Sequence, residues 1–243
     1  MSGFLRSMMI GLTVVALAFP TAVGAGFGDM LKGVAKTFGG GGATDSDIVA
    51  GLRQALEIGT EAAVTSLSAV DGYYGNPQVK IPLPPSVLKM ESVLRATGFG
   101  GQLDAFELTM NRAAEKAAPE AKALFWDAIG GMSFADAKKI LNGREDEATR
   151  YFREKTSPGL TSVFKPIVGE AVDSVGVTRT YKDLNDRIST LPFAQAFSVD
   201  LDDYVTRYAL DGLFVLIAEE EANIRRDPSA RVTELLKKVF SKQ

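Results

Sequence analysis

The chain has 243 residues, carries 27 Lys and Arg against 30 Asp and Glu, and contains neither His nor Cys. The lack of His and Cys excludes catalytic sites built on an imidazole or a thiolate, disulfides, and the zinc, haem and iron–sulfur centres that these residues ligate. A pI of about 5.2 argues against nucleic acid as a partner, because proteins that bind nucleic acid need a basic surface.

Residues 1–25 have the pattern of a secretory signal peptide. Arg6 is their only charged residue, Met8–Ala18 is almost entirely apolar, and small residues follow at Ala22–Ala25. The apolar run is shorter than the roughly 20 residues that cross a bilayer. We therefore predict cleavage after Ala25 and a periplasmic location, with a retained signal anchor as the alternative.

Residues 26–43 are predicted to form a short amphipathic segment followed by a Gly-rich tether at residues 39–42. Segment 26–38 is interpreted either as a frayed helix that docks on the following domain or stays mobile, or as a helix that makes a weak contact with a membrane surface or a protein. Its apolar residues fall on one helical face: Phe27, Leu31, Val34 and Phe38.

Residues 44–243 are predicted to form one all-α globular domain, a multi-helix bundle, because apolar residues recur at helical spacing and no stretch alternates like a strand. In the first half of this domain, the expected helices are one from Thr44–Asp47 to about residue 70, a short one capped by Ser86 and ending near Gly98, one lined by Leu103 and Phe106, and one opened by Pro119. In the second half they are one between Ser133 and Gly143, one starting at Ser157-Pro158, one over Tyr181–Ile188, a long one over 202–226 and a last one after Ser229.

Residues 71–85 interrupt the helical pattern, because their prolines lack an N–H donor and restrict the preceding residue. Val79, Ile81 and Leu83 occur at every second position, as in an extended segment with one buried face. The segment is either a strap that crosses the bundle or a binding edge. In the second case the candidate binding residues are Tyr73, Tyr74 and Lys80.

Asn111 flanks the apolar stripe of its helix, and the next residue, Arg112, falls on the predicted solvent face. An ion pair or a hydrogen-bonded clamp explains both residues, and Asn111 is also a candidate binding residue. Another candidate, Glu220, continues the apolar stripe of the long helix, whereas Glu219 and Glu221 are predicted to leave that stripe. Glu220 is therefore either a rim residue or a buried carboxylate with a raised pKa, as in a general acid.

No cofactor, metal site or catalytic residue is predicted. The acidic run 200–203 lacks the glycine and the distal Glu of a calcium loop. Asp203, Arg207 and Asp211 share one helical face, which favours a solvated stripe with Asp–Arg pairs. Gly130-Gly131 and the tether at 39–42 lack the strand and the Lys-Ser/Thr of a phosphate-binding loop.

Several separated segments, in order, resemble the exported bacterial family DUF4197, a domain of unknown function. The resemblance covers about residues 44–243 and implies an all-helical envelope protein of Gram-negative bacteria, but it supplies no activity and no catalytic residue. The segments that carry it are Asp71–Pro84 (DGYYGNPQVKIPLP), Glu107–Ala123 (ELTMNRAAEKAAPEAKA), Tyr151–Val168 (YFREKTSPGLTSVFKPIV), Asp200–Arg226 (DLDDYVTRYALDGLFVLIAEEEANIRR) and Leu235–Phe240 (LLKKVF).

Three functions fit these observations. The favoured hypothesis is a non-enzymatic periplasmic helical protein that binds a ligand or an unknown partner, because no convergent catalytic set is present. A lipid-handling bundle is the first alternative and would require an apolar cavity of several hundred Å3. A hydrolase of envelope glycans is the second and would require two carboxylates about 5–9.5 Å apart in a cleft, one of them with a raised pKa.

Overall fold

The structure is a computed structural model that describes residues 44–174, 186 and 200–226. The predicted signal peptide, the segment 26–38, the predicted helix at 181–188 except residue 186, and the predicted helix after Ser229 lie outside the described residues. The described residues all belong to one compact unit.

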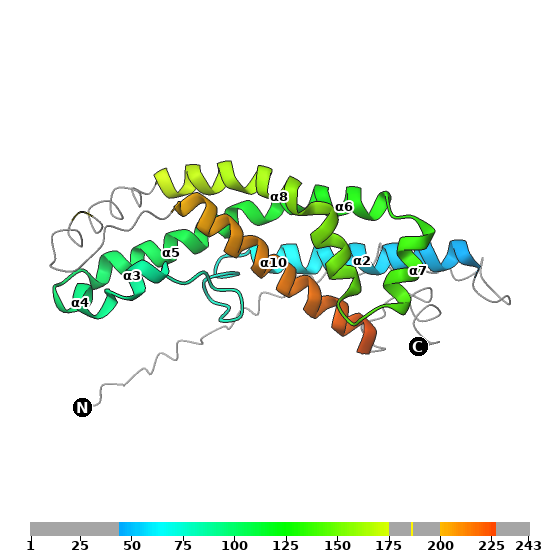
Figure 1. Cartoon of the computed structure of the whole chain (residues 1–243), viewed down its shortest axis with the longest axis horizontal. Helices are drawn as coiled ribbons and strands as arrows, with labels where there is room; N and C mark the ends of the chain where they lie inside the picture. Colours follow the sequence, from blue (N-terminus) through cyan, green and yellow to red (C-terminus); the bar gives the residue numbers. More distant parts are fainter. Residues whose placement is uncertain (1–43, 175–185, 187–199, 227–243) are drawn as a thin grey trace, which may run out of the picture. The chain divides into compact units, whose positions relative to one another are not determined.

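The described residues contain helices and no strand, which confirms the predicted all-α bundle (Figure 1). The long helix α10 packs along α8 and α2, and α5 packs along α8. The elements in chain order are α2 (Asp45–Ser68), α3 (Pro85–Leu88), α4 (Glu91–Ala96), α5 (Gly100–Ala117), the 3-10 helix η1 (Ala118–Glu120), α6 (Ala121–Gly130), α7 (Phe134–Asn142), α8 (Glu147–Ser174) and α10 (Leu201–Arg226).

Two helices begin with a capping box, one at a predicted N-cap candidate, Thr44, and one at Ser133, where the sequence resembles such a box. The Thr44 hydroxyl accepts a hydrogen bond from the N–H of Asp47 at 3.2 Å, and the Asp47 carboxylate accepts one from the N–H of Thr44 at 2.9 Å. Ser133 and Asp136 repeat the arrangement at the start of α7. Each box satisfies backbone N–H groups that have no partner within the helix.

The segment before α5 differs from its prediction. Ser86 was expected to cap one helix, but it lies inside α3, which begins directly after Pro84. A second short helix, α4, follows, and Gly98 ends it with a φ of 88°. Proline at the first helical position needs no N–H donor, so the prolines before Ser86 can begin the helix themselves.

The prediction that a helix starts at Ser157-Pro158 is wrong, because α8 continues through Pro158 and Pro166. An internal proline costs a helix about 3 kcal/mol, but α8 buries a row of apolar side chains that includes Phe152, Leu160 and Phe164. Hydroxyl groups also bond back to preceding carbonyls here, as Thr156 does to Phe152 at 2.7 Å. Prolines and such bonds bend helices, and Figure 1 shows α8 bent along its length.

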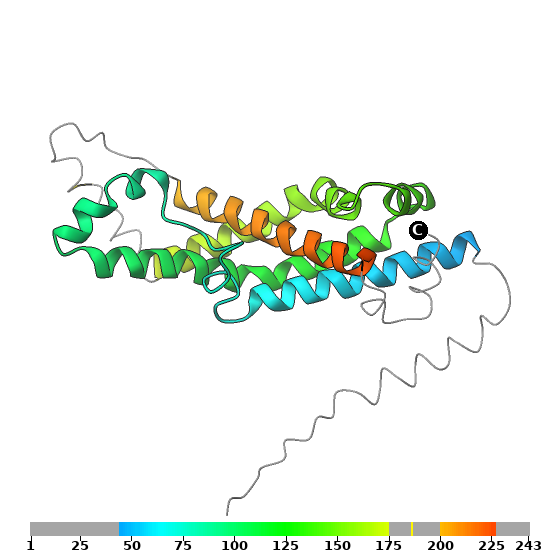
Figure 2. The ribbon, with the colours of Figure 1, turned by 90° about the horizontal axis from the view of Figure 1, so that it is seen from below.

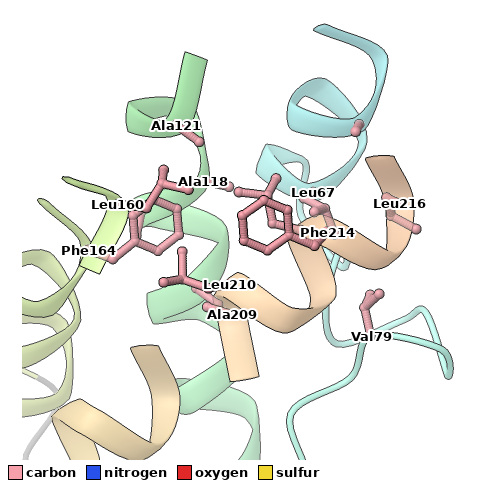
Figure 3. Packing of buried hydrophobic residues seen from close by; sticks show 14 of the residues in the cluster. Leu67, Val79, Ala118, Ala121, Leu160, Phe164, Ala209, Leu210, Phe214 and Leu216 are labelled. Atoms are coloured by element: carbon pink, nitrogen blue, oxygen red, sulfur yellow. The ribbon is translucent and has the colours of Figure 1, made fainter. Parts of the chain in front are cut away.

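The core joins side chains from all the longer helices. Phe125 of α6 lies edge-on to Phe152 of α8, with ring centroids 5.3 Å apart, and to Phe214 of α10 at 6.2 Å. Figure 3 shows side chains of α2, α8 and α10 meeting around the small residues Ala118 and Ala121, which let the helices approach closely.

Residues 71–84 form the strap that the proline pattern predicted. Val79, Ile81 and Leu83 are buried at alternate positions, as expected for an extended segment. Figure 2 shows the strap beside α10 on its way from α2 to α3. Gly212 of α10 permits this contact, because a Cβ atom at that position would lie 2.9 Å from Tyr73 Cε1 and 3.0 Å from Val79 Cβ.

Candidate functional site

Asn111 of α5 fastens the middle of the strap. Its Oδ1 accepts a hydrogen bond from the N–H of Ile81 at 2.8 Å, and its Nδ2 donates to the carbonyl of Ile81 at 2.9 Å. The side-chain amide thus pairs with the strap backbone as a neighbouring strand would. Asn111 is fully buried, and a second bond from Nδ2 to the carbonyl of Glu107 leaves it no free donor.

Glu115, one helical turn after Asn111, fastens the start of the strap. Its Oε1 accepts hydrogen bonds from the N–H groups of Tyr73 and Tyr74 at 3.1 and 3.2 Å. Arg112 balances this buried carboxylate with an ion pair at 2.6 Å and also contacts Asp71 at 2.7 Å. The pattern of ion pair and clamp predicted for Asn111 and Arg112 is therefore confirmed.

Tyr73, Tyr74 and Lys80 complete the anchoring of the strap. Tyr73 is fully buried and its hydroxyl donates to the carbonyl of Ala209 at 2.7 Å; burial raises its pKa, so it stays neutral. Lys80 pairs with Glu107 at 2.8 Å and lies 4.5 Å from the centre of the Tyr74 ring. The fold thus gathers four of the five predicted binding residues at the strap, where Tyr73, Lys80 and Asn111 use their polar groups to hold it.

Glu220 is a half-buried residue at the contact with α2, and its Cβ lies near Gly59. The buried carboxylate of α10 is instead Glu221, which is 7% exposed, so the prediction that Glu221 leaves the apolar stripe is wrong. Glu221 bonds to Arg225 at 2.9 Å and to the first turn of α8. It contributes to the packing of three helices.

A cavity of about 360 Å3 lies where α6, α7 and α8 meet. Its size falls in the range of small-molecule sites, and helices rather than loops position most of its wall. Gly159 lets α8 approach α6 at this point, since a Cβ there would lie 3.2 Å from Leu124 Cδ2. The lining residues are Leu124, Asp127, Ala128, Gly131, Asp136, Tyr151, Lys155, Thr156 and Gly159.

The cavity wall carries charges of both signs. Asp136 is held in its ionised form, because hydrogen bonds from Ser133 lower its pKa and Lys155 adds a favourable charge. The hydroxyl of Tyr151 donates to the carbonyl of Ala128 at 3.0 Å, so its oxygen can still accept a hydrogen bond. In the part of the chain described, Asp127 and Lys155 form no ion pair with any side chain.

The family described as "Protein of unknown function (DUF4197)" matches residues 42–241. The chain belongs to the DUF4197 family. No curated protein and no solved structure matches it significantly. The family therefore confirms the resemblance carried by the strap and the long helices, and it assigns no role to the cavity.

No pattern in the sequence of this DUF4197 protein predicted the cavity. Its charged residues are far apart in the chain, and only the packing of α6, α7 and α8 brings Asp127, Asp136 and Lys155 to one place. The available signal was indirect: Gly131 and Gly159, two small residues beside helices, mark places where backbones approach or turn. For Glu221 the signal was clearer, because Ile217, Glu221 and Ile224 follow each other at helical spacing.

Proposed function

We propose that this DUF4197 protein is an exported, periplasmic, non-enzymatic protein that binds a small polar molecule in the cavity between α6, α7 and α8. The observation that carries the proposal is the lining of this cavity: charged side chains from three helices line it, and neither Asp127 nor Lys155, both solvent-exposed, forms an ion pair within the part of the chain described. Acidic and basic side chains without an ion-pair partner in the protein are available to a ligand.

The same lining disfavours the hydrolase alternative. Two carboxylates, Asp127 and Asp136, do share the cavity. A glycosidase needs a carboxylic acid with a raised pKa as proton donor, whereas the hydrogen bonds of Ser133 lower the pKa of Asp136. Asp202, whose pKa is raised by burial, lies on α10 and does not line the cavity.

The lining also disfavours the lipid-handling alternative for this cavity. A carrier of acyl chains needs an enclosed apolar space of several hundred Å3. Here Asp127, Asp136 and Lys155 share the wall with Leu124 and Ala128. The apolar pocket beside Glu221 is far smaller, with about 10 Å3 of space.

Export is supported by the signal-peptide pattern of residues 1–25. Within the described ranges 44–174 and 200–226, no helix has the length and apolar character required to cross a membrane. N-terminal sequencing of the protein from its own cells tests this part of the proposal. A chain that begins at or near Gly26 supports export with cleavage, and an intact Met1 on membrane-bound material overturns it.

Binding is tested by native mass spectrometry of the protein purified gently from its own cell envelope. We expect an additional mass from a bound small molecule that is lost in Ala128→Leu, which adds apolar bulk to the cavity wall. Ala135→Leu is the matched control, because Ala135 is exposed on α7 and does not line the cavity. If the bound mass persists equally in both variants, or if none occurs in the unmodified protein, the cavity is not the binding site.

A further inference from the structure

The arrangement of charge in the α6–α7–α8 cavity indicates the chemical class of its ligand. This inference rests on the proposed function. Acidic groups come from the α6 and α7 sides, with Asp127 on α6 and Asp136 in the first turn of α7. The cationic group, Lys155, comes from α8. The cavity therefore has acidic walls and a basic wall that belong to different helices.

These opposite charges do not neutralise each other by direct contact. Neither Asp127 nor Asp136 forms an ion pair with Lys155 in the described residues, although Lys155 is close enough to lower the pKa of Asp136. One oxygen of Asp136, Oδ2, accepts the hydrogen bonds of Ser133. The other oxygen stays available, as does the carboxylate of Asp127.

We propose that the ligand is a compact zwitterion whose ammonium group binds Asp127 and Asp136 and whose anionic group binds Lys155. Such a molecule would satisfy both signs of charge at once, whereas a simple amine or a simple anion would leave one wall unpaired. The Tyr151 oxygen can accept a hydrogen bond from the ammonium group, and the apolar surface of Leu124 and Ala128 suits the short carbon chain between the two charges. A carboxylate and a phosphate are the two forms of the anionic group that Lys155 would accept.

A matched series of probes tests this inference on the full mature chain: 4-aminobutanoate, which carries both charges, and butylamine and butanoate, which carry one each. Titration calorimetry at low ionic strength should give an affinity for 4-aminobutanoate at least tenfold above that for either single-charge probe. 2-Aminoethyl phosphate replaces the carboxylate by a phosphate and reports which anion is preferred.

Two variants separate the two ends of the ligand. Lys155→Met should reduce the affinity for 4-aminobutanoate to that for butylamine and leave butylamine unaffected. Asp127→Asn should reduce it to the level of butanoate. Lys138→Met and Asp146→Asn are the matched controls, because both residues are exposed and neither lines the cavity. Circular dichroism confirms that each variant is folded.

The inference is overturned if the three probes bind equally, if none binds, or if the controls weaken binding as much as the cavity variants. The proposed function is judged separately by native mass spectrometry. A cavity-bound molecule that is not a zwitterion would leave the binding function standing and remove this inference, whereas the absence of any cavity-bound molecule would remove both.

Discussion

The carboxylate of Glu221, near the end of α10, accepts hydrogen bonds from both the backbone N–H and the hydroxyl of Thr149, each at 2.9 Å. It also accepts one from the N–H of Ala148 at 3.0 Å. These N–H groups lie in the first turn of α8, where no intrahelical acceptor exists, so a side chain from another helix caps α8. Arg225 balances the charge and donates to the carbonyl of Ile140 in α7 at 2.8 Å.

Removal of this carboxylate should be strongly destabilising. Glu221→Ala leaves two buried N–H groups without their acceptor and removes the carboxylate that pairs with Arg225, and we expect a loss of about 3 kcal/mol in the free energy of unfolding. Urea denaturation followed by circular dichroism measures the loss. Glu220→Ala is the control, expected within about 0.5 kcal/mol. Equal effects of the two substitutions would show that Glu221 does not have this role.

The Asn111 side chain should be essential to the strap. Asn111→Ala removes both bonds to Ile81 and leaves its buried N–H and carbonyl unpaired, at an expected cost of about 2–3 kcal/mol. Hydrogen exchange should show faster exchange at the N–H of Ile81 than in the unmodified protein. Asn142→Ala, at an exposed position, should change stability by less than about 0.5 kcal/mol. Unchanged exchange at Ile81 would contradict the assignment.

Gly212 should be intolerant of alanine even though alanine favours helices. Gly212→Ala places a Cβ at 2.9 Å from Tyr73 and 3.0 Å from Val79, and we expect a net loss of about 1–3 kcal/mol in thermal or urea unfolding. Gly101→Ala in α5 is the matched control, because its added Cβ would have no atom within 4 Å other than those of its chain neighbours and its own helix backbone. That substitution should be neutral or stabilise by up to about 1 kcal/mol. A stabilised Gly212→Ala variant would refute the close packing of the strap.

Asp202 should make stability depend on pH. Burial, and next the negative charges of Asp200 and Asp173, raise its pKa above the usual 3.8, so the folded state tolerates its charge less well than the unfolded state does. Stability is therefore lost as the pH rises through the raised pKa, and Asp202→Asn should stabilise the protein at pH 7. The gain should disappear below the unfolded-state pKa. Urea melts at pH 3 and pH 7 measure the difference.

Asp203→Asn is the control for Asp202. Asp203 is exposed, and its Oδ1 lies 3.5 Å from Nζ of Lys165. The substitution removes this surface ion pair, so it should slightly lower the stability and should not stabilise the protein at pH 7. Similar gains for both substitutions would show that net charge, rather than the burial of Asp202, causes the effect.

Features set by neighbouring residues could be predicted from the sequence. The capping boxes at Thr44 and Ser133 depend on side chains three positions apart, and the strap depends on local proline chemistry and on the alternation of Val79, Ile81 and Leu83. Each of these signals is contained within a few residues, and the packing of the helices agrees with it.

Features that depend on other helices could not be predicted in this way. The continuation of α8 through Pro158 is decided by apolar burial over its whole length, which outweighs a local helix-breaking preference. Glu220 and Glu221 are 100° apart around α10. The apolar stripe that begins at Val205 therefore does not determine which of the two faces α8. The α6–α7–α8 cavity forms only where these three helices meet, because its charged residues lie far apart in the chain.

The strap also has a consequence for the order in which the chain can fold. The hydroxyl of Tyr73 bonds to the carbonyl of Ala209, a residue 136 positions later in the chain. Closure of so long a loop is slow compared with helix formation, and α2 and α5 can form before α10 is present. A nascent chain that ends before α10 therefore leaves the Tyr73 ring and Val79 uncovered, and this aromatic and aliphatic surface is a predicted site for a chaperone until α10 arrives.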